Sequence, residues 1–266
     1  MTLLPEWIKE ITRFIETHTL IEASTDFSTD FHLYYLPDDQ LYVHFVDSTL
    51  VKGNHEHYFF NLYQQKAKQK IRLITIWEDQ YIHYKKVIQS RLLSSFGKTH
   101  KIHARVTEVR QLNQTELDDF LTQHHLQGST KAKHKFGLFY KGELVSVASF
   151  SKACPIDRDQ VRYRSHELIR FCNKTGSTVV GGLSKLIAHF VKKHKPEDIM
   201  TYADCDWGLG KGYEKIGFQL IEHTPARAFY IDKVNFKRHW TMSSQLPIQF
   251  TKAFNAGSLK YILFLK

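Results

Sequence analysis

The order of strands and helices predicted from residue 101 onward most strongly constrains the fold of this chain. Alternating apolar residues predict strands, and apolar residues three and four positions apart predict helices. The expected order is a strand (101–111), a helix capped by Asn113 or Thr115, a hairpin (136–140 and 144–150), a strand (167–171), a helix after Gly181-Gly182, a strand (199–203), a short helix (213–216) and two strands (219–222 and 228–232). The polar segment 152–164 is expected to be a loop. This order is typical of an α/β fold with a mixed sheet.

The first 97 residues show a different pattern. They predict a helix (5–18) with Pro5 as its first residue, two extended runs (31–36 and 41–46), a helix (56–70), a strand (71–77) and a helix (81–96) ended by Gly97. We therefore expect a small α/β domain over 1–97 and a second domain over 98–266.

Net charge indicates the class of partner. The chain has 37 Lys and Arg against 27 Asp and Glu, a formal charge of +10. A basic protein binds polyanions by releasing their counterions, so nucleic acid is the expected partner, although an ordinary solvated surface would have the same composition.

Apolar runs and cysteines indicate the compartment. No apolar run approaches the roughly 18 residues that cross a bilayer, and we expect no membrane partner. Three cysteines without CxxC spacing are expected to be reduced thiols of a cytoplasmic protein.

Two glycines at a strand-to-helix junction form the first candidate site. Gly181 and Gly182 would let the backbone approach a phosphate at the helix N-terminus, where Ser184 and Lys185 could add a hydroxyl and a cation. The alternative is a tight turn that requires glycine, with Ser184 in the first turn of the helix.

A carboxylate and a phenol form the second candidate site. Asp204 follows a predicted strand, where α/β sheets place ligands, and Tyr213 follows three glycines. Together they could accept and donate protons while a weakly nucleophilic amine reacts. Alternatively, Asp204 caps the next turn and Tyr213 packs in the core.

An arginine within a predicted strand forms the third candidate site. Alternation places Arg170 and Leu168 on one face and Glu167 on the other. Burying an arginine requires a partner, so Arg170 either faces a ligand or pairs with an acid such as Glu143. The histidine pairs His55/His57 and His100/His103 have no completing ligands, so no metal site is predicted.

Several of these blocks together resemble a family of phage and mobile-element proteins, the Hef-type homing endonucleases. They include Phe136-Gly-Leu-Phe-Tyr, Glu167-Leu-Ile-Arg-Phe, Val180-Gly-Gly-Leu-Ser and Tyr213-Glu-Lys-Ile-Gly-Phe. The C-terminal halves of that family resemble the Mom DNA-modification protein of phage Mu, an N-acetyltransferase-like (GNAT-like) enzyme that modifies adenine N6.

The resemblance implies a GNAT-like acyltransferase domain over 98–266 that acylates an exocyclic amine of a base, in a bacterial or phage-infected cell. It places Arg170, Ser184, Asp204 and Tyr213 at the active site and double-stranded DNA as the partner. The acetyl-CoA loop of acetyltransferases reads R/Q-x-x-G-x-G/A, whereas Thr178 and Leu183 stand at its ends here. An acyl-CoA-like donor is therefore possible, held by Gly181, Gly182, Ser184 and Lys185, but its identity stays open.

The N-terminal block Ile71-Arg-Leu-Ile-Thr-Ile-Trp resembles the very-short-patch-repair-like nuclease half of that family, a restriction-endonuclease-like domain. Such nucleases hold Mg²⁺ with carboxylates, but Leu33 and His44 stand at the expected positions. The resemblance thus implies a degenerate nuclease that serves as a DNA-binding platform. The candidate nucleic-acid contacts are Lys66, Lys68, Lys70, Lys85, Lys86, Arg91 and, as a stacking surface for a flipped base, Trp207.

Two alternatives remain open at this point. One is a Mg²⁺-dependent homing or repair endonuclease that uses Asp26, Asp30 or Asp47. The other is a DNA-binding protein without catalytic activity.

Overall fold

The computed structural model describes residues 4–23, 31–48, 51, 55–158, 160–241 and 248–265. It divides into two compact units. Unit 1 contains Met1–Gln89, Ala203–Gly210 and Glu222–Leu259, and unit 2 contains Ser90–Tyr202, Lys211–Ile221 and Lys260–Lys266. Two units are found where two domains were expected, but the division is not the single boundary after residue 97.

The segment Glu222–Leu259 belongs to unit 1 because its side chains enter that core. The Phe229 ring lies 4.9 Å from that of Trp77, and Arg238 forms an ion pair of 2.8 Å with Asp79. Such contacts join residues far apart in sequence, so the hydrophobic pattern of a single strand does not reveal them.

Unit 1 consists of two small sheets with helices. Its elements are α1 (Glu6–Glu16), β1 (Glu22–Ala23), β2 (His32–Leu36), β3 (Leu41–Val46), α2 (Tyr58–Lys68), β4 (Arg72–Trp77), the start of α3 (Glu78–Ser95), η2 (Cys205–Trp207), β14 (Ala228–Asp232), β15 (Arg238–His239) and β16 (Phe250–Phe254). The sheets have the orders β1-β2-β3-β4 and β15-β14-β16. The β3 and β4 strands are parallel, and the other pairs are antiparallel.

The helix α1 illustrates why these elements form. Ile8, Ile11 and Ile15 recur at helical spacing and are fully buried, so one face of the helix packs into the core. The sequence had suggested that Pro5 is the first residue of this helix. In the structure Pro5 precedes the helix, which begins at Glu6.

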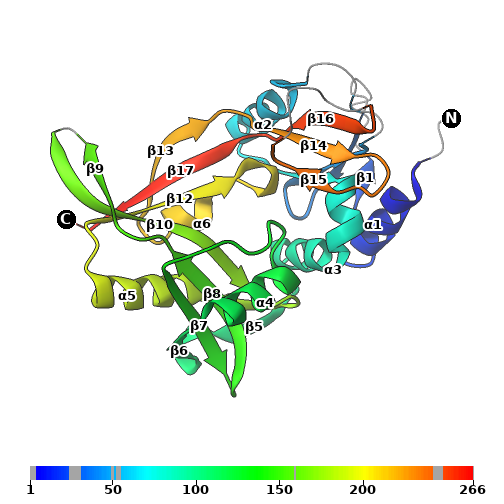
Figure 1. Cartoon of the computed structure of the whole chain (residues 1–266). Coiled ribbons are helices and arrows are strands. Elements are labelled where there is room, and N and C mark those ends of the chain that lie inside the picture. The colour runs from blue at the N-terminus through cyan, green and yellow to red at the C-terminus, as the bar shows by residue number, and fades with distance from the viewer. Residues whose placement is uncertain are drawn as a thin grey trace. The chain divides into compact units, whose positions relative to one another are not determined.

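Unit 2 is built around a mixed sheet. Its elements are the end of α3, β5 (His100–His103), η1 (Ala104–Val106), β6 (Glu108–Gln111), α4 (Gln114–His124), β7 (His134–Tyr140), β8 (Glu143–Phe150), β9 (Cys154–Arg158), β10 (Val161–Asn173), β11 (Ser177–Val180), α5 (Gly182–His194) and α6 (Lys211–Glu214). Three further strands, β12 (Asp198–Asp204), β13 (Gln219–Thr224) and β17 (Ser258–Phe264), have residues in both units. The strand order is β13-β17-β12-β10-β8-β7-β6, with β9 on β10 (Figure 1).

This architecture confirms the mixed α/β class, but two sequence-based expectations were wrong. The segment 101–111 is not one strand, because η1 separates β5, which pairs with β11, from β6, which pairs with β7. The segment 152–164 is not a loop, because β9 pairs with the first half of β10 as a hairpin. Most residues of that hairpin are exposed, so its sequence lacks the run of buried apolar residues that marks the other strands of this sheet.

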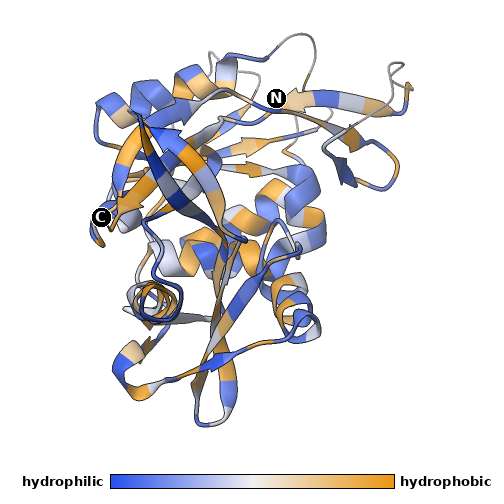
Figure 2. Cartoon of the chain, turned by 60° about the vertical axis from the view of Figure 1, so that its left-hand side comes forward, coloured by the Kyte–Doolittle hydropathy of each residue, from blue (hydrophilic) through white to orange (hydrophobic). Residues whose placement is uncertain are grey.

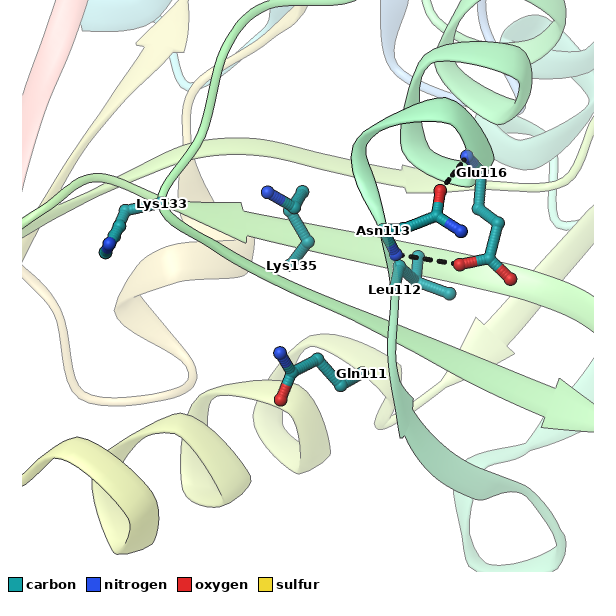
Figure 3. Close-up of a pocket in the computed structure, with 6 residues that line it drawn as sticks. All are labelled: Gln111, Leu112, Asn113, Glu116, Lys133 and Lys135. Carbon is teal, nitrogen blue, oxygen red and sulfur yellow. Dashed lines mark hydrogen bonds between the residues drawn. The ribbon is translucent and has the colours of Figure 1, made fainter.

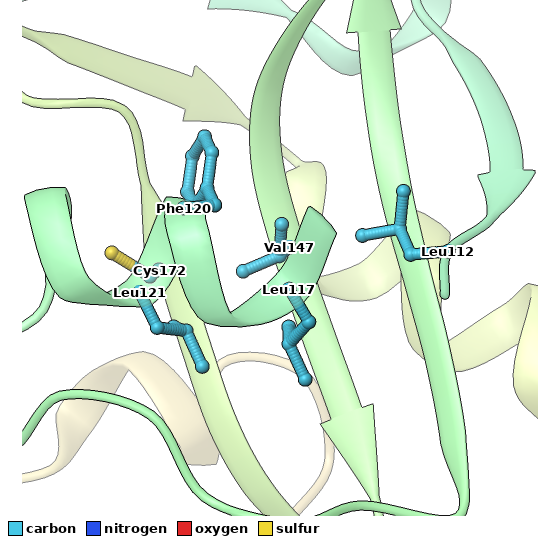
Figure 4. Close-up of a cluster of buried hydrophobic side chains, with 6 residues drawn as sticks. All are labelled: Leu112, Leu117, Phe120, Leu121, Val147 and Cys172. Carbon is cyan, nitrogen blue, oxygen red and sulfur yellow. The ribbon is translucent and has the colours of Figure 1, made fainter. Parts of the chain in front are cut away.

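The sheet of unit 2 is held to α4 by a small apolar cluster (Figure 4). Asn113 caps the helix in a capping box with Glu116, and this fixes where the helix starts. Leu117 and Leu121 then face Val147 of β8 and Cys172 of β10. Strands and helices carry both apolar and polar residues along their length (Figure 2), as expected for elements with one buried face. None of the helices in the described ranges is long and apolar enough to cross a membrane.

Truncating Leu117 to alanine is expected to destabilise the protein by about 2–5 kcal/mol, because Leu117 is fully buried and the truncation leaves a cavity. Urea unfolding measures the loss. Thr115→Ala, on the exposed side of the same helix, should change the free energy of unfolding by less than about 0.5 kcal/mol. Equal effects of the two substitutions would show that α4 does not anchor this core.

Candidate functional site

The candidate site of unit 2 lies where β10 and β12 stop pairing. The two parallel strands pair over only three positions, from Ser165 opposite Asp198 to Glu167 opposite Met200. Beyond this point β10 continues to Asn173 and β12 to Asp204, and these described residues are not paired with each other. The Thr201 hydroxyl donates a 3.0 Å hydrogen bond to the Leu168 carbonyl and so replaces the next bond of the ladder.

A β-bulge in β10 accompanies this separation. Leu168 lies opposite Phe150 of β8, but Arg170 lies opposite Ser149, so Ile169 is an extra residue. A bulge bends the strand and redirects the side chains that follow it. Neighbouring positions of β8 face opposite sides of the sheet, so Arg170 shares a face with Glu167 and not with Leu168. The alternation predicted from the sequence was therefore wrong.

The bulge also positions the Arg170 guanidinium. Its Nη1 donates to the Ile169 carbonyl at 2.9 Å, and its Nε donates to the Gly128 carbonyl at 3.5 Å. Burial raises the pKa of the Glu167 carboxyl, and the charge of Arg170 acts against that rise. The expected alternative partner, Glu143, pairs with Lys174. Arg170 is thus half-buried beside an acid on its own strand.

A hydrogen bond to Thr201 holds Tyr213 beside the point where β10 and β12 stop pairing. Its phenol is hydrogen-bonded to the Thr201 hydroxyl, and its ring lies 5.6 Å from that of Tyr261. Burial raises the pKa of the Tyr213 phenol, with smaller opposing effects from Thr201 and Arg91. The phenol is therefore protonated at neutral pH and can donate a proton.

His125 and Arg91 complete this group, which we call the arginine site (Arg91, His125, Glu167, Arg170, Thr201 and Tyr213). Burial, followed by the charges of Arg91 and Arg170, lowers the pKa of His125 to about 3. The neutral imidazole accepts a 3.1 Å hydrogen bond at Nδ1 from the Gln127 amide. Arg91 was expected to be a surface contact for DNA, but it lies near His125, Cys172 and Tyr213.

The glycine pair forms the N-terminus of α5 as expected. Gly181 has φ of +77°, which only glycine adopts readily, and it precedes the helix. A Cβ on Gly182 would lie 3.1 Å from Val179 and 3.2 Å from Leu138, so this glycine also allows close packing. Ser184 is exposed in the first turn of the helix.

Lys185 is hydrogen-bonded to backbone carbonyls of the protein. Its ammonium donates to the Ala104 carbonyl at 2.8 Å and also to the Thr107 carbonyl. These bonds hold the start of α5 against η1. A phosphate at this helix terminus would therefore contact the backbone amides and Ser184 before it contacts Lys185.

Two other residues predicted to act at the site, Asp204 and Trp207, lie in unit 1. The Asp204 carboxylate accepts a 3.0 Å hydrogen bond from the Asp206 amide and caps η2, which is the structural alternative considered for it. Asp206 is buried and accepts hydrogen bonds from the Trp77 indole and the Ala256 amide. Burial and Asp204 raise the pKa of Asp206. Trp207 is half-buried at the end of η2.

The lysines predicted to contact DNA have different environments. Lys66 is only 7% exposed and its ammonium lies 4.0 Å from the centre of the Tyr42 ring, so the prediction that it contacts a phosphate was wrong. Lys85 forms an ion pair with Glu10. Lys68, Lys70 and Lys86 are exposed. Phosphate binding by these three remains a prediction.

The two positions at which the resemblance places metal-binding carboxylates lie on neighbouring strands. Leu33 of β2 and His44 of β3 are direct cross-strand partners, and both are buried. Asp47 follows β3 and is 6% exposed, whereas Asp26 and Asp30 lie outside the described residues. Within the described ranges, no group of three His, Cys, Asp or Glu side chains could hold a metal ion. All three cysteines are free.

No protein-family model and no curated protein matches the chain. Similar solved structures include Eis1 from Mycobacterium abscessus (17% identity, 48% of this chain and 34% of that one, TM-score 0.37). They also include a Bacillus subtilis acetyltransferase in complex with CoA (13%, 60% and 99%, TM-score 0.38) and a GNAT family acetyltransferase from Elizabethkingia anophelis (11%, 60% and 99%, TM-score 0.34). The chain thus spans about a third of Eis1.

His44 is expected to make the protein sensitive to acid. It is fully buried, burial lowers its pKa from 6.5 to about 3, and neither ring nitrogen has a hydrogen-bond partner within the described residues. Between these two pKa values the unfolded chain binds the extra proton, so stability falls as the pH decreases below 6.5. At pH 5 the loss relative to pH 7.5 is about 2 kcal/mol from this residue.

Urea unfolding of wild type and His44→Leu at pH 7.5 and pH 5 measures this contribution. The variant should lose about 2 kcal/mol less than wild type over this range. His57→Gln, at an exposed histidine of the same unit, should behave as wild type. A parallel loss of stability in wild type and His44→Leu would show that His44 is not the group responsible.

Proposed function

We propose that the chain is a GNAT-like N-acyltransferase that acylates an exocyclic amine of a nucleic-acid base. The observation that carries the proposal is the separation of β10 from β12 at a bulge, with Arg170 and Tyr213 on the two sides of it. The separated backbone of β12 and the glycine-started helix α5 offer hydrogen-bond donors to an acyl carbonyl and to phosphate groups. An acyl-CoA-like thioester fits this combination of donors.

The chemistry needs one proton acceptor and one proton donor. The amine nitrogen forms a bond to the thioester carbonyl carbon, and the carbon–sulfur bond breaks. Tyr213, protonated at neutral pH, gives its proton to the departing thiolate. The amine proton passes to a carboxylate.

Two carboxylates are candidates for that acceptor. Glu167 has a raised pKa and lies within unit 2 beside Arg170, which favours it. Asp204 is the acceptor that the sequence resemblance implies, and its carboxylate already caps η2. Comparing Glu167→Gln with Asp204→Asn separates the two, because asparagine keeps the cap while removing the base.

Two features support a nucleic-acid substrate. The net charge of +10 favours a polyanion. The arginine site brings together two arginines and a neutral histidine, which suit an anionic group adjacent to the reacting amine. Trp207 is the proposed stacking surface for a base that leaves the duplex.

The test is to co-express the protein with plasmid DNA, digest the DNA and weigh the nucleosides. Wild type should produce an altered nucleoside with added acyl mass, and Tyr213→Phe should lower its yield by about 10²- to 10⁴-fold, because the proton donor is lost. Lys141→Ala, at an exposed hairpin turn, serves as the control and should leave the yield unchanged.

Two results would contradict the proposal. One is the absence of any altered nucleoside in DNA and in RNA from the same cells. The other is an altered nucleoside whose yield is the same in wild type and in Tyr213→Phe.

A further inference from the structure

Two basic runs that are far apart in sequence meet on unit 2. Lys131-Ala-Lys-His-Lys135 leads into β7, and Lys192-Lys-His-Lys195 ends α5. The rings of His134 and His194 lie 4.0 Å apart, so the centres of the two runs are in contact. Lys193 also donates a 2.7 Å hydrogen bond to Gln111 of β6, which joins α5 to the same strand edge. We call this surface the basic face (Lys131, Lys133, Lys135, Lys192, Lys193 and Lys195, with His134 and His194).

Lys135 of the basic face interacts electrostatically with the Asp118 carboxylate, but ion pairs do not neutralise the face in the described part of the chain. Among the described residues, no ion pair joins a carboxylate to any of its six lysines. Arg164 adds a further cation, because its guanidinium donates to the carbonyls of His194 and Lys195 at the end of α5. Like charges gathered in this way repel one another, and the folded state gains nothing from them without an anionic partner.

Acids beside the face accept hydrogen bonds from other groups. Asp118 accepts one from the Gln114 amide at 2.6 Å and another from the Ser129 hydroxyl. Glu116 accepts a 2.7 Å hydrogen bond from the Asn113 amide in the capping box, and Glu197 accepts a 2.6 Å bond from the Arg164 amide. The effect of the surplus charge is visible at His134. Burial, followed by His194, His166, Lys133 and Lys135, lowers the pKa of His134 to about 4. The lysines therefore carry the positive charge of the face at neutral pH, and the histidines are neutral.

A pocket of about 540 Å³ opens beside the face (Figure 3). Its lining combines the two cations Lys133 and Lys135 with the neutral side chains of Gln111 and Asn113. Figure 3 shows the lysines on the β7 side of the pocket and Asn113 and Glu116 on the α4 side. A phosphate oxygen there would accept hydrogen bonds from ammonium and amide groups, while Glu116 keeps its carboxylate on the capping box.

We infer that the basic face holds the sugar–phosphate backbone of a nucleic acid through Lys133, Lys135, Lys192 and Lys193. Its cations are spread over two elements, as a strand of successive phosphates requires, and are not gathered around one phosphate. None of the large exposed apolar side chains of the described residues belongs to either run, so the face has nothing to insert into a lipid bilayer. The inference rests on the proposed function only for the class of partner. It assigns the main backbone contact to unit 2 and not to the lysines of residues 66–86 that the sequence had favoured.

Binding of a fluorescein-labelled 20-base-pair DNA duplex, followed by anisotropy over a salt series at pH 7.5, tests this inference without any turnover. The double variant Lys133→Gln/Lys192→Gln should bind about tenfold more weakly. It should also reduce the slope of log K against log salt by about 2, one for each lost phosphate contact. Lys141→Gln/Lys215→Gln removes the same charge from exposed positions outside the face and should leave the slope unchanged. Circular dichroism melting confirms that both variants are folded.

Three outcomes would overturn the inference. One is an equal loss of affinity in the two double variants, which would reflect total charge only. Another is the absence of duplex and single-strand binding by wild type. The third is tighter binding to phosphatidylglycerol vesicles than to DNA, with the same dependence on Lys133 and Lys192. Nucleoside modification without face-dependent binding would overturn this inference alone, and face-dependent binding without modification would overturn only the proposed chemistry.

Discussion

The bulge at Ile169 is the feature on which the candidate site depends. Without the extra residue, Arg170 would share a face with Leu168. With the bulge, Arg170 turns to the side of Glu167, β10 bends, and its pairing with β12 stops after Glu167. The hydrogen bond from Thr201 to the Leu168 carbonyl then satisfies a backbone group that the lost ladder would leave unpaired. Tyr213 is held at this point by the same hydroxyl.

The sequence predicted the local elements better than their partners. The helix capped by Asn113, the β7–β8 hairpin and the helix started by Gly181 all depend on neighbouring residues, and all were found. The bulge at Ile169 depends on register against β8, and the membership of Glu222–Leu259 in unit 1 depends on Trp77 and Asp79. These are contacts across long stretches of chain, which periodicity within one element does not encode.

The same distinction holds for functional residues. Arg170 and Tyr213 were identified because an arginine in a strand and a tyrosine behind glycines are unusual in themselves. Glu167, His125 and Thr201 have no such local signal, and only the folded chain places them beside Arg170 and Tyr213. For Lys66 the local signal was misleading. Its charge suggested a surface contact with DNA, but the side chain is buried and its ammonium lies over the Tyr42 ring. The two runs of the basic face were visible as charge, but their contact through His134 and His194 was not.

The central claim is that an acyl donor binds where β10 and β12 separate. Hydrogen–deuterium exchange of the full chain with and without a mixture of acyl-CoA thioesters tests it most directly. We predict slower exchange at the amides of Thr201–Ala203 and of Gly182–Lys185, the backbone donors that would hold the acyl carbonyl and the phosphates. Unchanged exchange in both segments at millimolar thioester, or protection confined to other parts of the chain, would contradict this account.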